Sequence, residues 1–394
     1  MDFKAYVPEI SGGQVIAYAG LLSGYHVTYS VIVHPDDIEQ EWRTLQERTD
    51  CSYFQSWGWI GVWLKQIAAD FRPLIVKVWY RGSLVGLGIF VRGNIRRRLF
   101  ITSNALFLNE YPVDGRNMVI EYNGLLAERG HRKAVYAEAL HHLFSTDAAL
   151  DEVFLGAIDS RAVSLQDPLY PEWRQAQIRQ QLLEESSTWA VDLESIDAGE
   201  GSYLGTLSRN RRAQIRRAFR LYEASGRLQL EHATGLDMAL EYFSELKKMH
   251  TLRWQKAGRR GAFANPIWEN FHRTLVESRF DSGEIQLLRV RNDKTVIGYL
   301  YNLVWRKHVY VLQTGFSAER DHGLMPGYVV HAMAIAYNKK LGMARYDLMH
   351  GDELYKKIIC NQSNKLAWVV LQRQRTRFRL ENMVLALKRY ITTL

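Results

Sequence analysis

The sequence predicts an α/β protein made of two similar mixed-sheet units that share a cleft. Segments with the alternating apolar pattern of strands take turns with segments that repeat apolar residues at helical spacing. At 394 residues the chain is longer than one hydrophobic core usually supports, so two units are expected. The third observation is a repeat, because each half contains a helix, a hairpin of two strands, a second helix and a strand in that order.

The first half is expected to contain a strand, two helices, a strand hairpin, a helix and a final strand. Asp36 and Asp37 suit the N-cap of the first helix, because their carboxylates can accept bonds from its unpaired N–H groups. Two apolar runs joined at Arg81-Gly82 predict the hairpin, with Gly86 inside the second run. The expected elements lie at residues 25–33, 36–48, 54–71, 72–80, 83–93, 132–144 and 150–158.

The second half repeats this order, with Gly298 in its hairpin at the place that Gly86 takes in the first. A polar stretch at residues 167–187 is expected to connect the halves. The expected elements of the second half lie at residues 189–193, 211–225, 236–254, 268–278, 284–290, 295–305, 309–317, 328–340 and 344–348.

The expected units span residues 1–175 and 188–372, followed by a basic amphipathic helix at 373–394. Four residues of that helix form an apolar stripe. They are Leu380, Met383, Leu387 and Tyr390. The stripe predicts that the helix either docks on the second unit or lies on a membrane surface.

The bulk composition describes a globular, basic protein. Hydrophobic residues make up 47% of the chain, and no apolar run reaches the roughly 18 residues of a membrane-spanning helix. Two cysteines are too few for a disulfide framework, and the N-terminus lacks the features of a secretory signal. We therefore expect a cytoplasmic location, with peripheral contact to the inner membrane face as an option. The net charge of +9 favours nucleic acid, anionic lipid or a phosphorylated cofactor without choosing among them.

One segment of the second half has the geometry of an anion site. A strand that ends near Ser317 is followed by a polar loop with Arg320 and then by Pro326-Gly327 at the start of a helix. Pro326 suits the first helical turn, and the unpaired N–H groups of a helix start favour a phosphate. We expect a pyrophosphate on residues 327–330, although a β-α-β unit without a ligand has the same pattern.

An arginine-rich helix lies earlier in the same half. Its charged residues fall on one face and its apolar residues on another. The charged row consists of Arg209, Arg212, Arg216 and Arg220. This row is either a solvated surface or a binding face for a cofactor phosphate, a lipid headgroup or RNA.

The helix that ends near residue 254 carries a further group of polar and aromatic residues. His250 and Trp254 are four residues apart and therefore share a face. Trp254 suits the wall of a substrate cleft, and His250 suits proton transfer near neutral pH. Core packing at the end of the helix explains both residues equally well.

Four motifs occur in a fixed order over residues 54–357. They are Phe54-Gln55-Ser56 with Trp57 and Trp59, the run 207–212 that continues to Arg216-Arg217, His250 with Arg253-Trp254, and the set Pro326-Gly327, Asp347, Gly351-Asp352 and Tyr355-Lys356. In this order and spacing they resemble GNAT-superfamily acyltransferases of the CelD/BcsL type. These are relatives of the FemA/FemB-like peptidoglycan-bridge transferases.

The resemblance implies a tandem GNAT fold and acyl transfer from a thioester to an amine. The second unit alone carries the Pro-Gly loop and the Tyr-Lys ending, so it is expected to bind the cofactor while the first shapes the acceptor side. The implied cofactor-binding residues are Arg320, Gly323, Gly327, Tyr328, Gln313 and Gly315. The implied substrate-binding residues are Trp254, Arg253, Arg212 and Arg216.

The resemblance also suggests chemical roles. A base must take a proton from the amine, an N–H group must polarise the thioester carbonyl, and an acid must protonate the departing thiolate. Candidates for the base are Asp347, Asp352, His250 and His350. Tyr355 would be the acid, Lys356 would bind phosphate or stabilise negative charge, and the polarising N–H would lie near Gln313 to Gly315. Asp347 has an alternative structural role at the turn before Gly351.

In one respect the sequence departs from most GNAT enzymes. The usual pyrophosphate loop, Arg/Gln-x-x-Gly-x-Gly/Ala, appears only in a form stretched by two residues, from Arg320 to Gly327. The expected donor is therefore either acyl-coenzyme A or an acyl-carrier protein, and no metal is expected. The expected acceptor is a small-molecule or peptide amine. The alternatives are an aminoacyl-tRNA-dependent Fem-type transferase and a non-catalytic module that binds anionic membranes or RNA.

Overall fold

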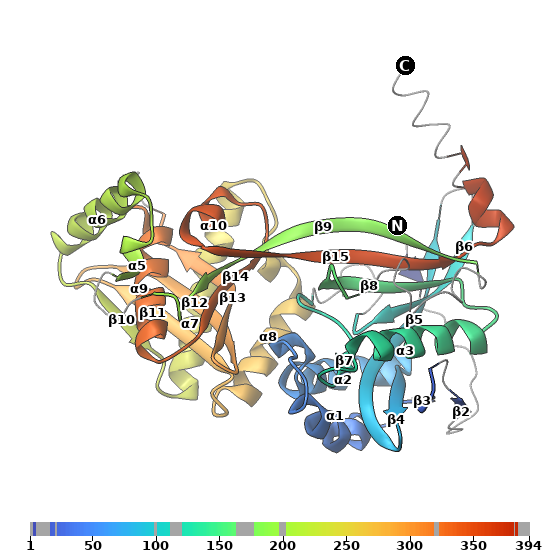
Figure 1. Ribbon diagram of the computed structural model, residues 1–394. Helices are drawn as coiled ribbons and strands as arrows, with labels where there is room; N and C mark the ends of the chain where they lie inside the picture. Colours follow the sequence, from blue (N-terminus) through green and yellow to red (C-terminus); the bar gives the residue numbers. More distant parts are fainter. Residues whose placement is uncertain are drawn as a thin grey trace. The chain divides into compact units, whose positions relative to one another are not determined.

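The computed structural model describes residues 3–4, 16–19, 22–97, 101–110, 120–162, 177–196, 202–318, 323–381 and 383–384. The chain folds as two compact units, one formed by Met1–Glu185 with Leu366–Leu394 and the other by Ser186–Lys365. In Figure 1 the colours run from blue to green over most of the first unit and from yellow-green to orange over most of the second.

The first unit alternates strands and helices. In chain order its elements are β1 (Phe3–Lys4), β2 (Ile16–Ala19), β3 (Tyr25–Val31), η1 (Pro35–Ile38), α1 (Glu39–Gln46), η2 (Tyr53–Gln55), α2 (Trp57–Phe71), β4 (Leu74–Tyr80), β5 (Ser83–Arg96), β6 (Thr102–Leu108), β7 (Leu126–Ala127), α3 (Arg132–Thr146) and β8 (Glu152–Asp159). Strands β3, β4, β5 and β6 are antiparallel neighbours, and β8 runs parallel to β6. The short strands β1 and β7 pair with β5, and β2 pairs with β3.

The second unit follows the same plan. Its elements are β9 (Ile178–Asp192), α5 (Ser202–Gly205), α6 (Arg209–Glu223), β10 (Gln229–His232), α7 (Leu236–Lys256), η4 (Ala262–Ala264), α8 (Pro266–Arg279), β11 (Ile285–Arg291), β12 (Val296–Trp305), β13 (His308–Phe316), α9 (Pro326–Lys340), β14 (Arg345–His350), α10 (Leu354–Ile359) and β15 (Gln362–Arg373). Strands β10, β11, β12 and β13 are antiparallel neighbours, and β14 runs parallel to β13.

The two units therefore repeat one topology. Each has four antiparallel strands and then a fifth strand parallel to the fourth. In each, two helices separate the first strand from the second, namely α1 with α2 and α7 with α8. A single helix, α3 or α9, separates the fourth strand from the fifth. The order of helix, hairpin, helix and strand that the sequence predicted for each half is confirmed.

The two hairpin glycines occupy equivalent positions. Gly86 pairs with Val78 and Gly298 with Val290, and in both hairpins the register shifts directly after this pair. A Cβ on Gly86 would lie 2.5 Å from Val135 of α3, and one on Gly298 would lie close to α9 and the end of β13. Both positions require glycine because a helix packs directly on the hairpin there.

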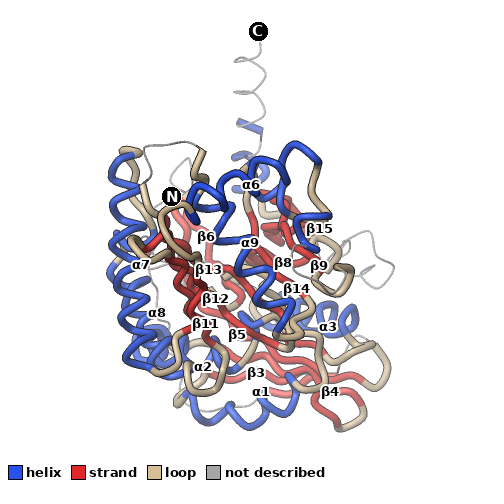
Figure 2. The backbone as a smooth tube through the Cα atoms, turned by 90° about the vertical axis from the view of Figure 1, so that its left-hand side faces the viewer, coloured by secondary structure: helices blue, strands red, loops and turns tan. Residues whose placement is uncertain are grey.

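Helices cover both faces of the sheet in the second unit. Gly298 faces Val330 of α9, whereas the ring of the next residue, Tyr299, lies 5.3 Å from the ring of Tyr242 in α7. Successive strand residues point to opposite faces, so α9 and α7 lie on opposite sides of the sheet. Figure 2 shows α7 and α8 along one side of β11, β12 and β13. Helix α6 joins the core on the α9 side.

Strands β9 and β15 each pair with a strand of the unit that does not immediately precede them in the chain. Strand β9 comes after β8, yet its residues 188–192 pair with β14. Strand β15 comes after β14, yet its residues 366–372 pair with β8. The expected division at residue 372 differs from the structure here, because apolar alternation indicates a strand but not its partner. Residues 178–187, expected as part of a connection, belong to β9.

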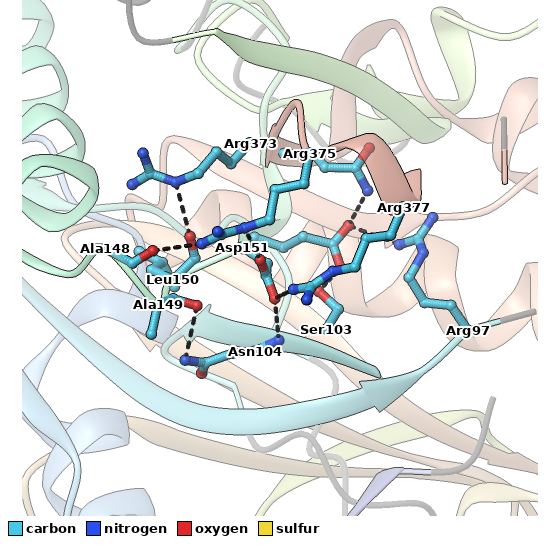
Figure 3. A network of polar contacts seen from close by, with 12 residues as sticks. Arg97, Ser103, Asn104, Ala148, Ala149, Leu150, Asp151, Arg373, Arg375 and Arg377 are labelled. Carbon is cyan, nitrogen blue, oxygen red and sulfur yellow. Dashed lines mark hydrogen bonds and ion pairs between the residues drawn. The ribbon is translucent and has the colours of Figure 1, made fainter. Parts of the chain in front are cut away.

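The basic segment after β15 docks on the first unit (Figure 3). Asp151 is 1% exposed and forms ion pairs with Arg375 and Arg377, while Asn104 donates its backbone N–H to the same carboxylate. Arg373 donates to the carbonyl oxygen of Phe144 in the last turn of α3, where a cation suits the helix dipole. Docking on the second unit was one of the two alternatives from the sequence, whereas the carboxylate that pairs with these arginines belongs to the first unit.

Beyond this segment the chain is helical at residues 376–381 and 383–384. Leu380 and Met383 of the expected apolar stripe are exposed, and the other two members of the stripe, Leu387 and Tyr390, lie outside the described residues. None of the described helices combines the length and hydrophobicity that crossing a membrane requires.

Candidate functional site

The candidate site lies where β13 and β14 stop pairing. Their parallel pairing covers three residue pairs and ends at Tyr310 and Asp347, although both strands continue. Just beyond, His331 of α9 is in contact with rings from β13, β14 and α10. They belong to Phe316, Tyr346 and Tyr355, with centroids 5.7, 6.1 and 6.0 Å from that of His331. Ligands collect at the C-terminal ends of parallel strands in α/β sheets.

His331 is buried and held on two sides. Its Nδ1 lies 3.0 Å from the hydroxyl oxygen of Tyr346, and its ring stacks on Tyr355 with an interplanar angle of 17°. Burial and then the nearby charge of Lys356 lower the pKa of His331 to about 3, so the imidazole is neutral at physiological pH. The sequence analysis missed this residue. Its signal was a histidine on an otherwise apolar helix face.

Tyr355 has the properties of a proton donor. Burial, followed by the negative charge of Glu353, raises the pKa of Tyr355 far above its usual range. The phenol therefore carries its proton at every physiological pH. The positive charge of Arg253 opposes this rise. Arg253 reaches the same cluster through Phe316, whose ring centroid lies 6.0 Å from its guanidinium carbon and 5.7 Å from that of His331.

Lys356 fastens the turn between β14 and α10. Its side chain is buried, and Nζ donates to the carbonyl oxygen of His350 and lies 3.2 Å from a carboxylate oxygen of Glu353. Gly351 has φ +138°, and a Cβ at this position would lie 2.8 Å from the same Nζ atom. The lysine charge therefore holds a turn that only glycine accommodates. Its expected role toward a phosphate stays a prediction.

Asp347 points away from His331. It follows Tyr346 in β14, so its side chain lies on the opposite face of the strand. There its carboxylate is fully buried, lies 3.3 Å from Nε of Arg345 and 3.4 Å from Nε2 of His308, and accepts the N–H of Met349 at 2.7 Å. These contacts stabilise the irregular end of β14, where Met349 has a left-handed φ of 64°.

Asp352, the other aspartate expected to act as base, is exposed to solvent. Its side chain is 81% exposed, and one carboxylate oxygen lies 3.9 Å from Nζ of Lys357. Water can reach this carboxylate, whereas that of Asp347 is fully buried. The base role of either aspartate stays a prediction.

His250 continues the buried stripe of α7. Its ring centroid lies 5.1 Å from that of Phe263 and 5.9 Å from that of Trp254. Burial and then the charge of Arg253 lower the pKa of His250 to about 4. Within the described residues its buried Nδ1 has no hydrogen-bond partner. Arg253 instead reaches β13, where its guanidinium carbon lies 6.0 Å from the ring centroid of Phe316.

The start of α9 offers few anion donors. Pro326 has no N–H, and the N–H groups of Tyr328 and Val329 donate to the carbonyl oxygen of Met325 at 3.0 and 3.2 Å. Gly327 is therefore the first-turn residue whose N–H remains to meet an anion. A Cβ on Gly327 would lie 3.3 Å from Phe316, so the first turn packs against the candidate site. The expected pyrophosphate over residues 327–330 has fewer donors than the sequence suggested.

The remaining cofactor-binding candidates lie on β13 and in the loop before α9. Gly315 is buried under α7, where a Cβ would lie 2.8 Å from the carbonyl oxygen of Leu246. Gln313 pairs with Tyr301 of β12 next to a register shift. Gly323 lies in the turn before α9, and Arg320 falls outside the described residues. These four cofactor roles stay predictions.

Helix α6 contacts the start of α9. The guanidinium carbon of Arg211 lies 4.8 Å from the ring centroid of Tyr328. Arg212 donates to the carbonyl oxygen of Gly205 at 3.4 Å, and Arg216 is exposed. The structure therefore places Arg211, which the sequence did not single out, closer to α9 than it places the predicted Arg216.

The equivalent position in the first unit is filled by the chain itself. Strands β6 and β8 also pair over three residue pairs, and Asn123 then joins them. Its backbone N–H donates to the carbonyl oxygen of Ala157 at 3.0 Å, and its Nδ2 donates to that of Leu108 at 2.9 Å. No bridge of this kind joins β13 to β14 among the described residues of the second unit. This difference separates the two repeats.

Glu110 lies beside this bridge, three residues beyond the last paired residue of β6, as Gln313 does on β13. Its carboxyl fills the space that the missing side chain of Gly156 leaves, where a Cβ would lie 2.2 Å from Oε1. Burial raises the pKa of Glu110 to about 7. The sequence analysis missed this residue because nothing in its neighbourhood indicates burial.

A family model matches most of the second unit. Residues 209–357 match the sequence model of the acetyltransferase (GNAT) domain. The matched segment contains α6, the parallel pair β13–β14 and the His331–Tyr355 contact, and the first unit repeats its strand order. The fold is therefore a tandem GNAT-like fold, as the sequence predicted.

Solved structures with a similar fold cover most of this chain. The crystal structure of FemX is 12% identical, with a TM-score of 0.53, over 84% of this chain and 95% of that one. A conserved protein of unknown function from Bacteroides thetaiotaomicron is 10% identical, with a TM-score of 0.51, over 87% and 99%. A tandem GNAT protein from the clavulanic acid biosynthesis pathway is 11% identical, with a TM-score of 0.45, over 89% and 99%. No curated protein matches the chain.

Proposed function

We propose that the protein is an N-acyltransferase that moves an acyl group from a thioester to an amine. The observation that carries this proposal is the cluster of His331, Tyr355 and Phe316 beyond the β13–β14 pairing, which Arg253 also reaches, within the segment that matches the GNAT domain model. The resemblance of the four sequence motifs supports the narrower assignment to the CelD/BcsL type. The acceptor is a small-molecule or peptide amine, and the donor is a thioester of coenzyme A or of an acyl-carrier protein.

The reaction needs three proton and charge transfers. The amine attacks the thioester carbonyl, and negative charge gathers on the carbonyl oxygen, where a backbone N–H of β13 near Gln313 to Gly315 would stabilise it. The carbon–sulfur bond then breaks, and the departing thiolate takes the proton of Tyr355. The proton that the amine loses goes to a base, for which Asp352 is the more accessible aspartate and Asp347 the more buried one.

The two aspartates can be separated by substitution. We expect Asp352→Asn to lower the transfer rate by about two to four orders of magnitude if this residue is the base, with little effect on stability. Asp347→Asn should instead destabilise the fold, because it breaks a buried ion pair with Arg345. Wild-type rates in both variants would assign the proton transfer to a histidine or to water.

The direct test is ligand-induced stabilisation. The melting temperature of the purified protein is measured with coenzyme A, with acyl-coenzyme A of several chain lengths, with an acyl-loaded carrier protein and with bulk tRNA. A ligand that binds the native state alone raises the melting temperature by mass action. A rise with a thioester supports the proposal, and its chain-length dependence defines the acyl group. No rise with any thioester contradicts it.

One observation favours a second candidate, aminoacyl transfer from tRNA. The unpaired arginines of α6 offer a surface for a phosphate backbone. A rise in melting temperature with tRNA, together with none from thioesters, would favour this function. The salt dependence of that binding would then report how many phosphates the arginines meet.

A further inference from the structure

Helix α6 concentrates positive charge. Its fifteen residues include six arginines and one glutamate, a formal charge of +5 on a chain whose total is +9. Some arginines elsewhere on the same unit have carboxylate partners, as Arg273 has Glu277 and Arg289 has Glu231. Within the described residues, the arginines of α6 form no ion pair. The charge on this helix is therefore available to a partner.

The arginines form a row along the exposed face of α6. The buried residues Ile215 and Ala218 hold the other face against the core. At about 1.5 Å per residue, the row is about 16 Å long. Its members are Arg209, Arg212, Arg216 and Arg220. A row of this length on an outward face is longer than a single phosphate group requires, and it suits the surface of a macromolecule.

The row begins beside the candidate site. At the N-terminal end of α6, Arg211 lies over the ring of Tyr328 in the first turn of α9. At the other end, the carbonyl oxygen of Tyr222 accepts a bond from Asn292 in the turn between β11 and β12. A partner that covers the row therefore has one end at the start of α9, next to Phe316 and Tyr355.

Within the described residues, the first turn of α9 offers one free N–H to a phosphate group. Pro326 lacks an N–H, and those of Tyr328 and Val329 are already bonded, which leaves Gly327 in the first turn. Coenzyme A carries a pyrophosphate and a further phosphate on its ribose. A phosphopantetheine arm on a carrier protein carries a single phosphodiester, and carrier proteins are acidic. Both features match what α6 and α9 present.

We propose that the arginine row of α6 docks an acidic acyl-carrier protein, whose phosphopantetheine arm enters the second unit past Gly327. The proposal rests on the proposed acyl transfer and names its donor. The carrier protein covers the row through charge complementarity, and its single phosphate meets the start of α9. The thioester then reaches the end of the β13–β14 pairing.

The test measures binding of a purified bacterial acyl-carrier protein in its acyl-loaded form. The dissociation constant is determined by fluorescence anisotropy at low and at moderate salt. The double variant Arg209→Glu/Arg220→Glu should weaken binding about tenfold or more at low salt, and the difference should shrink as salt screens the charges. The matched control Lys248→Glu/Lys340→Glu changes the net charge by the same four units at exposed positions outside the row, one of them on α7 across the sheet. It should bind like the wild type.

A transfer assay separates this proposal from the proposed function. The ratio of kcat/KM for the carrier thioester to kcat/KM for acyl-coenzyme A should exceed one in the wild type and fall in Arg209→Glu/Arg220→Glu. Equal binding of the carrier by all three proteins, or preferred transfer from acyl-coenzyme A, overturns carrier docking and leaves the acyltransferase proposal intact. Row-dependent carrier binding without transfer from any thioester supports docking and contradicts the acyltransferase proposal. Binding of tRNA in place of the carrier overturns docking in favour of RNA.

Discussion

Replacing Glu110 with Gln should stabilise the protein at pH 8 but not at pH 4. The carboxyl of Glu110 fills the space beside Gly156, and burial raises its pKa from 4.5 to about 7. The folded state therefore favours the protonated form. At a pH below the pKa of Glu110 in the unfolded state, both states carry the proton, and the carboxyl does not lower the free energy of unfolding. As the pH rises through the interval from 4.5 to about 7, the unfolded state releases its proton first, and the wild type loses stability.

The magnitude follows from the interval between the two pKa values. At about 1.4 kcal/mol per pH unit, the wild type loses up to about 3 kcal/mol by pH 8. The neutral amide of Gln has nearly the same shape and no charge to desolvate, so the variant escapes this loss. The difference in free energy of unfolding between Glu110→Gln and wild type should be near zero at pH 4 and largest above pH 7.

The assay is urea denaturation at pH 4, 6 and 8, followed by tryptophan fluorescence. The matched control is Glu184→Gln, an exposed position in β9 of the same unit, which should track the wild type at each pH. A difference that is the same at pH 4 and pH 8 would refute the reasoning, because it would not follow the titration of the carboxyl. A loss of stability in Glu110→Gln at pH 8 would show that the carboxylate has a cationic partner.

Three further predictions concern Tyr355, Gly298 and Asp151. Tyr355→Phe should lower kcat by about two to four orders of magnitude with KM nearly unchanged, because the acid acts only on the departing thiolate. An unchanged kcat in a thiol-release assay would exclude Tyr355 as the acid. Gly298→Val should destabilise the fold by about 1–3 kcal/mol, since its Cβ would lie 2.8 Å from Phe316. The control Gly205→Val, with open space around its Cβ position, should have a much smaller effect, and equal melting temperatures for the two variants would contradict this. Asp151→Asn should release the basic segment after β15, because it removes the charge that pairs with Arg375 and Arg377. Trypsin should then cleave this segment faster than in the wild type. Equal cleavage rates would mean that the ion pairs do not hold the segment.

The sequence predicted the repeated fold because the repeat leaves local signals. Each hairpin has two apolar runs around a short turn, and its glycine sits at the same register, Gly86 in one and Gly298 in the other. Periodicity and turn residues act over a few positions, so they can be recognised without knowledge of tertiary contacts. The order of helices and strands in both units followed from these signals.

The partners of β9 and β15 were not predictable by the same means. Val191 and Leu371 are buried strand residues with similar neighbours in sequence, yet one strand pairs with β14 and the other with β8. Pairing depends on chain segments more than a hundred residues away. An apolar pattern specifies that a strand is buried and says nothing about which edge it joins.

The candidate site was predicted in part. The C-terminal signature drew attention to Tyr355, and the structure stacks its ring on His331, which also contacts Phe316. His331 was missed because a buried histidine on an apolar helix face has no distinctive spacing. The number of free N–H groups at the start of α9 depends on the left-handed backbone of Met325, with φ 47°, and a methionine gives no sequence signal for that conformation.

The exchange of strands changes how this chain can be divided and how it can be made. A fragment that ends at residue 185 would keep β8 without β15, and a fragment that starts at residue 193 would keep β14 without β9. Each piece would expose an unpaired strand edge, which favours aggregation. During synthesis the first unit lacks its closing strand until residues 366–372 have emerged, near the end of the chain. The first unit therefore cannot be produced complete as one uninterrupted fragment, because its closing strand follows the whole second unit in the chain.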